Sequence, residues 1–117
     1  WIGPVTQEDM NLYLDITMKN FEPHKDKIVF YKETSDTCVH KFQDEQFDYI
    51  FIDGDHSYEG VKKDLNNYYS KVKKGGVFSG HDINLSSVQQ AVKEFREQNL
   101  ITNPISFTDV NVWYWVK

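Results

Sequence analysis

The feature that most constrains the fold is a nearly continuous apolar run, Phe47–Ile52, which ends abruptly in the polar sequence Asp53-Gly54-Asp55-His56. An apolar run of this length is typical of a strand that helices cover on both faces, as in a parallel sheet. Apolar residues then recur at helical spacing, with Ser57 as a candidate N-cap, at Val61, Leu65, Tyr68 or Tyr69, and Val72. This order of strand, acidic turn and helix predicts a crossover unit of an α/β fold.

The segments before this unit predict a helix and a strand. Thr6–Asp9 has capping-box spacing, and apolar residues follow at Met10, Leu14, Met18 and Phe21. We therefore expect a helix with one buried stripe. Ile28–Tyr31 is a short β-rich run bounded by charges and predicts a strand. Residues 34–36 form a loop or cap, and residues 37–42 a short helix.

The segments after the central unit continue the alternation. Lys73–Gly76 should end the central helix, because cations and glycines favour helix C-termini. Val77–Ser79 predicts a second strand, and Ser86 or Ser87 a cap for a helix with Val88, Ala91, Val92 and Phe95 on one face. Residues 104–107 and 110–116 predict a final hairpin turning around Asp109. We expect one α/β domain, residues 1–117, with parallel strands, crossover helices and a C-terminal antiparallel hairpin.

Composition narrows the class of partner. The 117 residues carry a formal net charge of -5, whereas proteins that bind through phosphate neutralisation are usually basic, so a nucleic-acid partner is disfavoured. The single cysteine, Cys38, has no internal disulfide partner. No apolar run approaches the roughly 20 residues that cross a bilayer. We expect a cytoplasmic protein without a membrane partner.

Two predicted strands end in acidic loops that contain histidine, Asp53–His56 and Gly80–Asp82. In an open parallel sheet, ligands bind at the carboxyl ends of the strands. If the strands are neighbours, the carboxylates and imidazoles share one crevice, where they require a metal, a bound polar ligand or a shared proton. Taken singly, Asp55 reads as a helix cap, and His56 and His81 as exposed or capping residues.

Together, the stretches Phe47–Glu59, Asp64-Leu65 and Lys74–Asp82 resemble class I S-adenosylmethionine-dependent methyltransferases, in the branch with "IDGDHSYE" and "GG…HD" signatures, related to sugar and small-molecule O-methyltransferases. The resemblance implies a Rossmann-like sheet of order 3-2-1-4-5-7-6. Its third, fourth and fifth strands would be Ile28–Tyr31, Phe47–Ile52 and Val77–Ser79, with the hairpin as the last two. The Gly-rich first strand would precede Trp1. We therefore expect this part alone to be inactive, and either to be marginally stable or to pair as a homodimer through its open sheet edge.

The resemblance also implies roles for individual residues. Asp53 and Asp82 would hold Mg²⁺ or another divalent cation, and His56 would act as general base on a hydroxyl of a small molecule or sugar. Because Ile83 stands where relatives have Asn, further ligands would come from Asp55, His81 or Asn84. S-adenosylmethionine would contact Ser35, Asp36, Asp53 and Gly54.

Two alternatives stay open at this point. Asp53-Gly54-Asp55 also fits the Asp-x-Asp of a haloacid-dehalogenase-type phosphatase, although that family places the motif on its first strand and usually continues it with Gly-Thr. The other alternative is a catalytically incomplete Rossmann-like module that binds or scaffolds.

Overall fold

The computed structural model describes residues 5–117 and divides the chain into two compact units, Trp1–Lys32 and Glu33–Lys117. The first unit consists of helix α1, Gln7–Phe21, and a short 3-10 helix, η1, Glu22–His24. The predicted capping box is confirmed: Asp9 N donates to Thr6 Oγ1 over 3.1 Å, and Thr6 N donates to Asp9 Oδ2 over 2.9 Å. The local sequence therefore sets where α1 begins.

Two expectations for the first unit are wrong. Helix α1 contains no buried residue, because this unit holds no strand or second long helix on which its apolar stripe can pack. Ile28–Tyr31 is not a strand. All four strands of the sheet lie in the second unit, and an extended segment becomes a strand only by joining a ladder with another strand.

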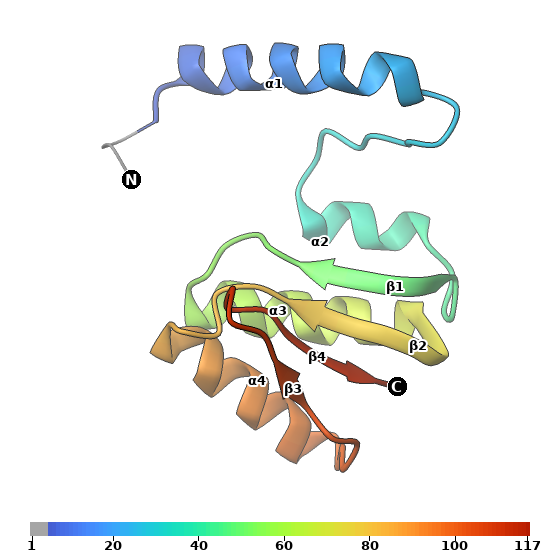
Figure 1. The fold of residues 1–117 in the computed structure, drawn as a ribbon, viewed down its shortest axis with the longest axis vertical. Helices are drawn as coiled ribbons and strands as arrows, with labels where there is room; N and C mark the ends of the chain where they lie inside the picture. The colour runs from blue at the N-terminus through green and yellow to red at the C-terminus, as the bar shows by residue number, and fades with distance from the viewer. Residues whose placement is uncertain (1–4) are drawn as a thin grey trace. The chain divides into compact units, whose positions relative to one another are not determined.

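The second unit is an α/β sheet with helices, shown in Figure 1. Its sheet runs in the order β1-β2-β4-β3, with β1 parallel to β2 and the other pairs antiparallel. This confirms the predicted partial Rossmann-like fold and reproduces the 4-5-7-6 part of the expected order. The elements are α2 (Ser35–Cys38), η2 (Val39–Lys41), β1 (Phe47–Ile52), α3 (Tyr58–Tyr68), η3 (Tyr69–Lys71), β2 (Val72–Gly80), α4 (Ser86–Gln98), β3 (Ser106–Phe107) and β4 (Trp113–Val116).

The start of β2 differs from the prediction. Val72 belongs to the strand and is fully buried, and Lys73–Gly76 forms a bulge in the ladder instead of a helix end. Gly75 has φ +87°, and its N–H donates to Lys117 O over 2.7 Å. Burial of Val72 against the helices fixes the strand here, so α3 ends earlier, at Tyr68.

Helices α3 and α4 bury one face of the sheet. The predicted apolar stripes of both helices are confirmed, and they pack on strand residues Ile50, Phe78, Trp113 and Trp115. The opposite face is open: Tyr49 and Phe51 of β1 are 57% and 40% exposed. Within the second unit, β1 is thus covered by helices on one face only, contrary to the expectation from its continuous apolar run.

Two helix starts also differ from expectation. The short helix predicted over residues 37–42 begins earlier, at Ser35, because Thr34 Oγ1 accepts from Thr37 N. Leu85, and not Ser86 or Ser87, is the N-cap of α4, and its side chain makes no capping hydrogen bond. Ser87 Oγ instead donates a hydrogen bond to the carbonyl oxygen of His56 over 2.8 Å.

Candidate functional site

The carboxyl ends of β1 and β2 lie side by side. Ile52 pairs with Gly80, and His81 N donates to Ile52 O over 3.0 Å. A Cβ on Gly80 would stand 2.4 Å from Trp113 Cζ2 and 2.8 Å from Ile52 O, so only glycine permits this close approach. The expected neighbouring of the two acidic loops is therefore confirmed, and Asp53 and Asp82 lie at the same edge.

Asp53, His81 and Asp82 form a cluster whose candidate ligand atoms lie within 4.8 Å of one another. His81 Nδ1 is 3.1 Å from Asp82 Oδ1 and 3.6 Å from Asp53 Oδ1. The other ring nitrogen, Nε2, lies 3.1 Å from Val110 O and must carry a proton, since a carbonyl oxygen only accepts. Nδ1 therefore faces the two carboxylates with its own lone pair, an arrangement that a cation placed between the three groups would fit.

The backbone of this cluster is held in an uncommon conformation. Asp82 has φ +62°, in the left-handed region that aspartate tolerates better than most residues. Hydrogen bonds on both sides keep it there: Leu85 N donates to Asp82 O over 2.9 Å, and Ile83 N donates to Asn111 O over 3.2 Å. Such conformations concentrate at functional sites, where the surrounding structure stabilises them.

His56 lines the same small cavity as the three cluster residues. Its loop is anchored at both ends, by Ser87 on its carbonyl and by Asp55 Oδ1, which accepts from Ser57 N over 2.8 Å. That backbone hydrogen bond lowers the pKa of the Asp55 carboxyl. Ser57 caps α3 as predicted. Asp55 thus shapes the loop, while the His56 ring makes no hydrogen bond within residues 5–117.

A second cavity, of about 620 Å³, lies beside the small one and shares Ile52, Asp53, Gly54 and Asp55 with it. The structure brings all four predicted cofactor residues to its wall: Ser35, Asp36, Asp53 and Gly54. Four aspartates but a single cation, Lys63, line it, so the wall is acidic. The lining residues are Thr34, Ser35, Asp36, Ile50, Phe51, Ile52, Asp53, Gly54, Asp55, Gly60, Lys63, Asp64 and Tyr68.

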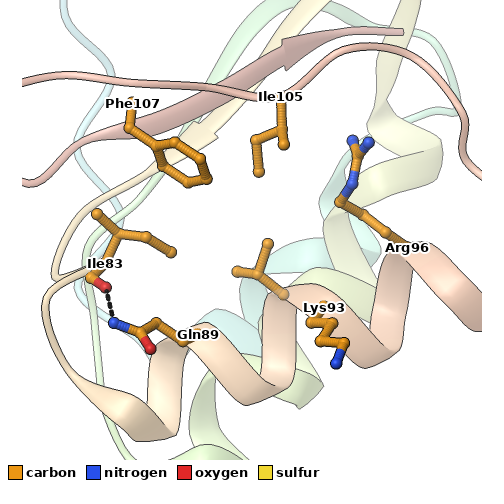
Figure 2. A pocket seen from close by; sticks show the side chains of 7 residues that line it. Ile83, Gln89, Lys93, Arg96, Ile105 and Phe107 are labelled. Carbon is orange, nitrogen blue, oxygen red and sulfur yellow. Dashed lines mark hydrogen bonds between the residues drawn. The ribbon is translucent and has the colours of Figure 1, made fainter.

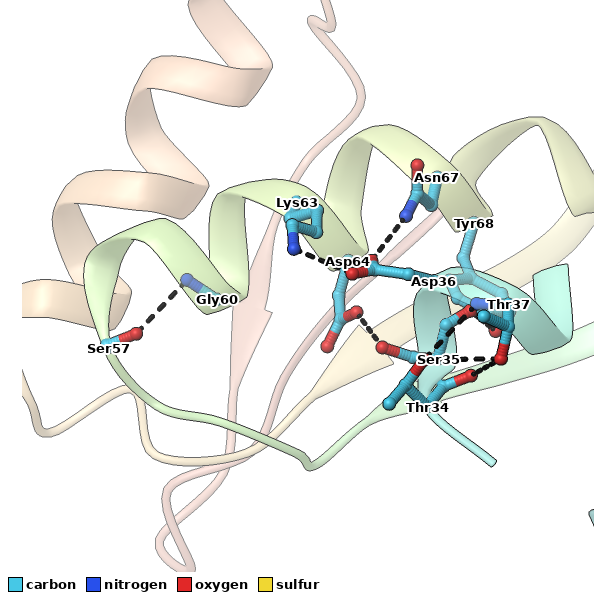
Figure 3. A network of polar contacts seen from close by, with 10 residues as sticks. All are labelled: Thr34, Ser35, Asp36, Thr37, Ser57, Gly60, Lys63, Asp64, Asn67 and Tyr68. Carbon is cyan, nitrogen blue, oxygen red and sulfur yellow. Dashed lines mark hydrogen bonds and ion pairs between the residues drawn. The ribbon is translucent and has the colours of Figure 1, made fainter. Parts of the chain in front are cut away.

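A polar network joins α2 to α3 along this cavity (Figure 3). Asp36 accepts from Lys63 Nζ over 2.6 Å and from Asn67 Nδ2 over 3.1 Å. Tyr68 OH donates to Ser35 O over 2.7 Å, and burial raises the pKa of Tyr68 to about 12. Asp36 and Ser35 are thus both engaged within the protein, which leaves the loop after β1, with Asp53 and Gly54, as the freer side of the wall.

Asp64 entered the sequence analysis only as part of the family resemblance, and no role was assigned to it there. Its side chain accepts from Ser35 Oγ over 2.7 Å, the residue is only 8% exposed, and desolvation raises the pKa of its carboxyl. Its position is the available signal: it lies between Val61 and Leu65 on the buried stripe of α3, where an acid needs a partner.

Fold and site together define an α/β protein of the methyltransferase type, with an acidic cavity at the carboxyl ends of its parallel strands. A family model described as "Methyltransferase domain" matches residues 6–83. The chain belongs to this family. This agrees with the resemblance found in the sequence.

Two solved structures are similar to the chain. The O-methyltransferase NovP is 26% identical, with a TM-score of 0.52, over 60% of this chain and 30% of that one. A Corynebacterium glutamicum protein is 10% identical, with a TM-score of 0.71, over 92% of this chain and 56% of that one, and it shows the fold alone. The chain thus spans at most about half the length of these two proteins. No curated protein sequence matches it.

Proposed function

We propose that this chain supplies part of the active site of an S-adenosylmethionine-dependent methyltransferase acting on a hydroxyl oxygen. Membership of the methyltransferase-domain family and the similarity to an O-methyltransferase support it. The observation that carries the proposal is the meeting of Asp53, His81 and Asp82 at the end of two neighbouring parallel strands. Since the family match runs from residue 6 to residue 83, across both compact units, we propose that both belong to one domain.

The acidic cavity fits the chemistry of the cofactor. S-adenosylmethionine offers an electrophilic methyl group on a positively charged sulfur, together with an adenosine rich in hydrogen-bonding groups. Ser35 and Asp64 supply a hydroxyl and a carboxylate, Ile50 and Phe51 supply apolar wall, and the excess of aspartates favours a cationic ligand. We therefore retain Ser35, Asp53 and Gly54 as cofactor contacts, with Asp36 holding Lys63 beside them.

The cluster of Asp53, His81 and Asp82 fits a divalent cation. Two carboxylate oxygens and one imidazole nitrogen converge, and the tautomer imposed by Val110 leaves Nδ1 as a lone-pair donor. A divalent ion bound there would lower the pKa of an acceptor hydroxyl. The proposed ligand set thus adds His81 to Asp53 and Asp82, while Asp55 is engaged in its loop.

His56 is the proposed general base. The acceptor hydroxyl must give up its proton as its oxygen forms the new bond to carbon, and an imidazole titrates in the range needed to accept that proton. His81 is a poorer candidate because both of its ring nitrogens already face oxygen atoms. The acceptor is a small molecule or sugar, and a second copy pairing at the free edge of β1 is a further proposal.

Direct cation binding tests this proposal without requiring turnover. Titration calorimetry with Mn²⁺ should show one site on the chain, and Asp53→Asn and Asp82→Asn should each weaken binding at least tenfold. Asp48→Asn, at the opposite end of β1, is the matched control and should leave the affinity unchanged. Equal affinity in all variants would reject the cluster as a cation site.

Methyl transfer provides the second test. Because this chain is proposed to supply only part of the active site, the assay uses the complete methyltransferase that contains it. With labelled S-adenosylmethionine and a panel of phenols and sugars it should yield a methyl ether, and chelation of divalent ions should suppress the reaction. Release of phosphate from p-nitrophenyl phosphate would instead support the phosphatase alternative. Failure to bind S-adenosylmethionine at all would support a binding or scaffolding module.

No helix among residues 5–117 is both long and apolar enough to cross a membrane. A cytoplasmic location and the lack of nucleic-acid partners stay predictions from composition.

A further inference from the structure

A second kind of cavity lies away from the acidic one, between α4 and the β3 strand (Figure 2). Its volume is about 480 Å³, and its wall is mostly apolar. No acidic residue lines it, in contrast to the four aspartates of the other cavity. The lining residues are Ile83, Gln89, Val92, Lys93, Arg96, Ile105 and Phe107.

Arg96 at one side of this cavity lacks a counter-charge. Its Nη1 is buried and has no hydrogen-bond partner, while Nη2 donates to Asn103 O over 2.5 Å. The guanidinium stacks 4.8 Å above the Trp115 ring, and desolvation lowers the pKa of Arg96. Among residues 5–117, no carboxylate forms an ion pair with it. A partly buried cation without an anion is costly, so the site favours an external anion.

The positions of the side chains divide the cavity into two parts. Figure 2 shows Ile83 and Phe107 at one side and Arg96 at the other, while the amine of Lys93 points away from the cavity. Lys93 meets only the solvent-exposed Glu97, at 4.0 Å, so its charge is weakly compensated. The Gln89 amide is already used, since its Nε2 donates to Ile83 O over 2.8 Å. The polar recognition available to a ligand is therefore cationic and confined to one side.

We propose that this cavity binds a small amphipathic anion, with its apolar body against Ile83, Val92, Ile105 and Phe107 and its carboxylate near Arg96. The apolar wall contributes affinity by burying hydrocarbon, and the Arg96 guanidinium selects a negative head group, with Lys93 adding only a screened charge at the rim. This site is separate from the proposed methyl-transfer site and does not depend on it. An aliphatic carboxylate such as octanoate has the required chemistry.

Octanoate and octanol form a matched pair of probes, alike except for the charged group. Titration calorimetry on the full chain should show octanoate binding at least tenfold more tightly than octanol. Octanoate should also change the fluorescence of the tryptophans, because Trp115 lies directly beneath Arg96. Equal binding of both probes, or binding of neither, would overturn the proposal.

Variants locate the site. Arg96→Gln should weaken octanoate binding about tenfold and leave octanol unchanged, whereas Lys93→Gln should weaken it only about twofold, because Lys93 is largely exposed. Ile105→Trp should block both probes by narrowing the cavity. Lys74→Gln, on the β2 bulge, is the control and should change neither.

Thermal unfolding of each variant separates lost binding from lost fold. A folded Arg96→Gln protein that still prefers octanoate over octanol would overturn the role of Arg96. Sedimentation tests the other occupant of an apolar groove, a second copy of the chain. Dimers that Ile105→Trp abolishes, without octanoate binding in the wild type, would assign the cavity to self-association and overturn the proposal.

Discussion

Aspartates lie at both ends of the β1–β2 strand pair, but the partners of their side chains differ. At the amino end, Asp44 pairs with Lys71 at 2.9 Å and Asp48 with Lys73 at 2.7 Å. At the carboxyl end, Asp53 and Asp82 have no lysine or arginine partner in the described chain and meet only the His81 ring. Balanced surface pairs leave no charge for a ligand, whereas converging carboxylates offer a place that a cation fits. The difference is the reason for proposing the carboxyl ends of β1 and β2 as the working edge.

The largest expected effect is that of His56→Ala on methyl transfer. Loss of a general base typically lowers turnover by roughly 10²–10⁴-fold. Affinity for S-adenosylmethionine, measured by calorimetry, should change little, because His56 lines the cluster cavity and not the neighbouring larger one. His40→Ala, an exposed histidine outside both cavities, is the control. Equal loss of turnover and cofactor affinity would make His56 structural.

Gly80→Ala should be the next largest change, in stability. The new methyl group would overlap Trp113 and the Ile52 carbonyl, which costs about 3 kcal/mol in the free energy of unfolding. Gly75→Ala is the counterpart in the β2 bulge, where a Cβ meets no atom within 4 Å and only the positive φ opposes it, at about 1 kcal/mol. Urea titrations compare the two. Equal destabilisation by the two variants would mean that the close packing around Gly80 does not hold the carboxyl ends of β1 and β2 together.

Asp64→Asn should show a pH-dependent effect. Burial raises the pKa of Asp64 in the folded state, so the protonated form is favoured there and ionisation opposes folding. The penalty is absent well below the ordinary value of 3.8, grows as pH rises through it, and is complete above the raised folded pKa. In the Asp64→Asn variant, the amide oxygen can still accept the hydrogen bond from Ser35 Oγ, but the negative charge is removed.

The stability of the Asp64→Asn variant relative to wild type should therefore be greater at pH 7 than at pH 3. Thermal unfolding at the two pH values measures this change. Asp36→Asn is a useful contrast, since Asp36 is paired with Lys63 and its loss should destabilise the protein at neutral pH. A gain for Asp64→Asn that is independent of pH would contradict a desolvated carboxylate.

The smallest effect on stability is expected at the amino end of the β1–β2 strand pair. Asp48→Asn removes one exposed ion pair, in which the Asp48 side chain is 85% exposed, and such pairs contribute about 0.2–1 kcal/mol. The change should shrink further in high salt. Asp53→Asn should not destabilise at all, because it removes repulsion from Asp82. Destabilisation by Asp53→Asn that exceeds that by Asp48→Asn would reverse the comparison of the two ends.

Much of the fold follows from local sequence. The alternation of apolar runs with helical stripes predicts β1, α3, β2 and α4, and the motif around Asp53 predicts the working edge. A local sequence pattern does not show which segments pair with one another. Ile28–Tyr31 has strand-forming residues but belongs to no strand of the sheet in residues 5–117. The site shows the same limit. The sequence offered His81 as one of three alternative further metal ligands, and the contact of its ring with Val110 favours it; a role for Asp64 emerged only from its burial.

Paramagnetic broadening by Mn²⁺ in nuclear magnetic resonance spectra tests the central claim most directly, because it reports where on the chain a divalent cation binds. Substoichiometric Mn²⁺ should broaden the signals of Asp53, His81, Asp82 and the nearby His56 first, and Mg²⁺ should reverse this. Broadening that begins at Asp44 and Asp48, or is spread evenly over the acidic surface, would contradict a cation site at the carboxyl ends of β1 and β2.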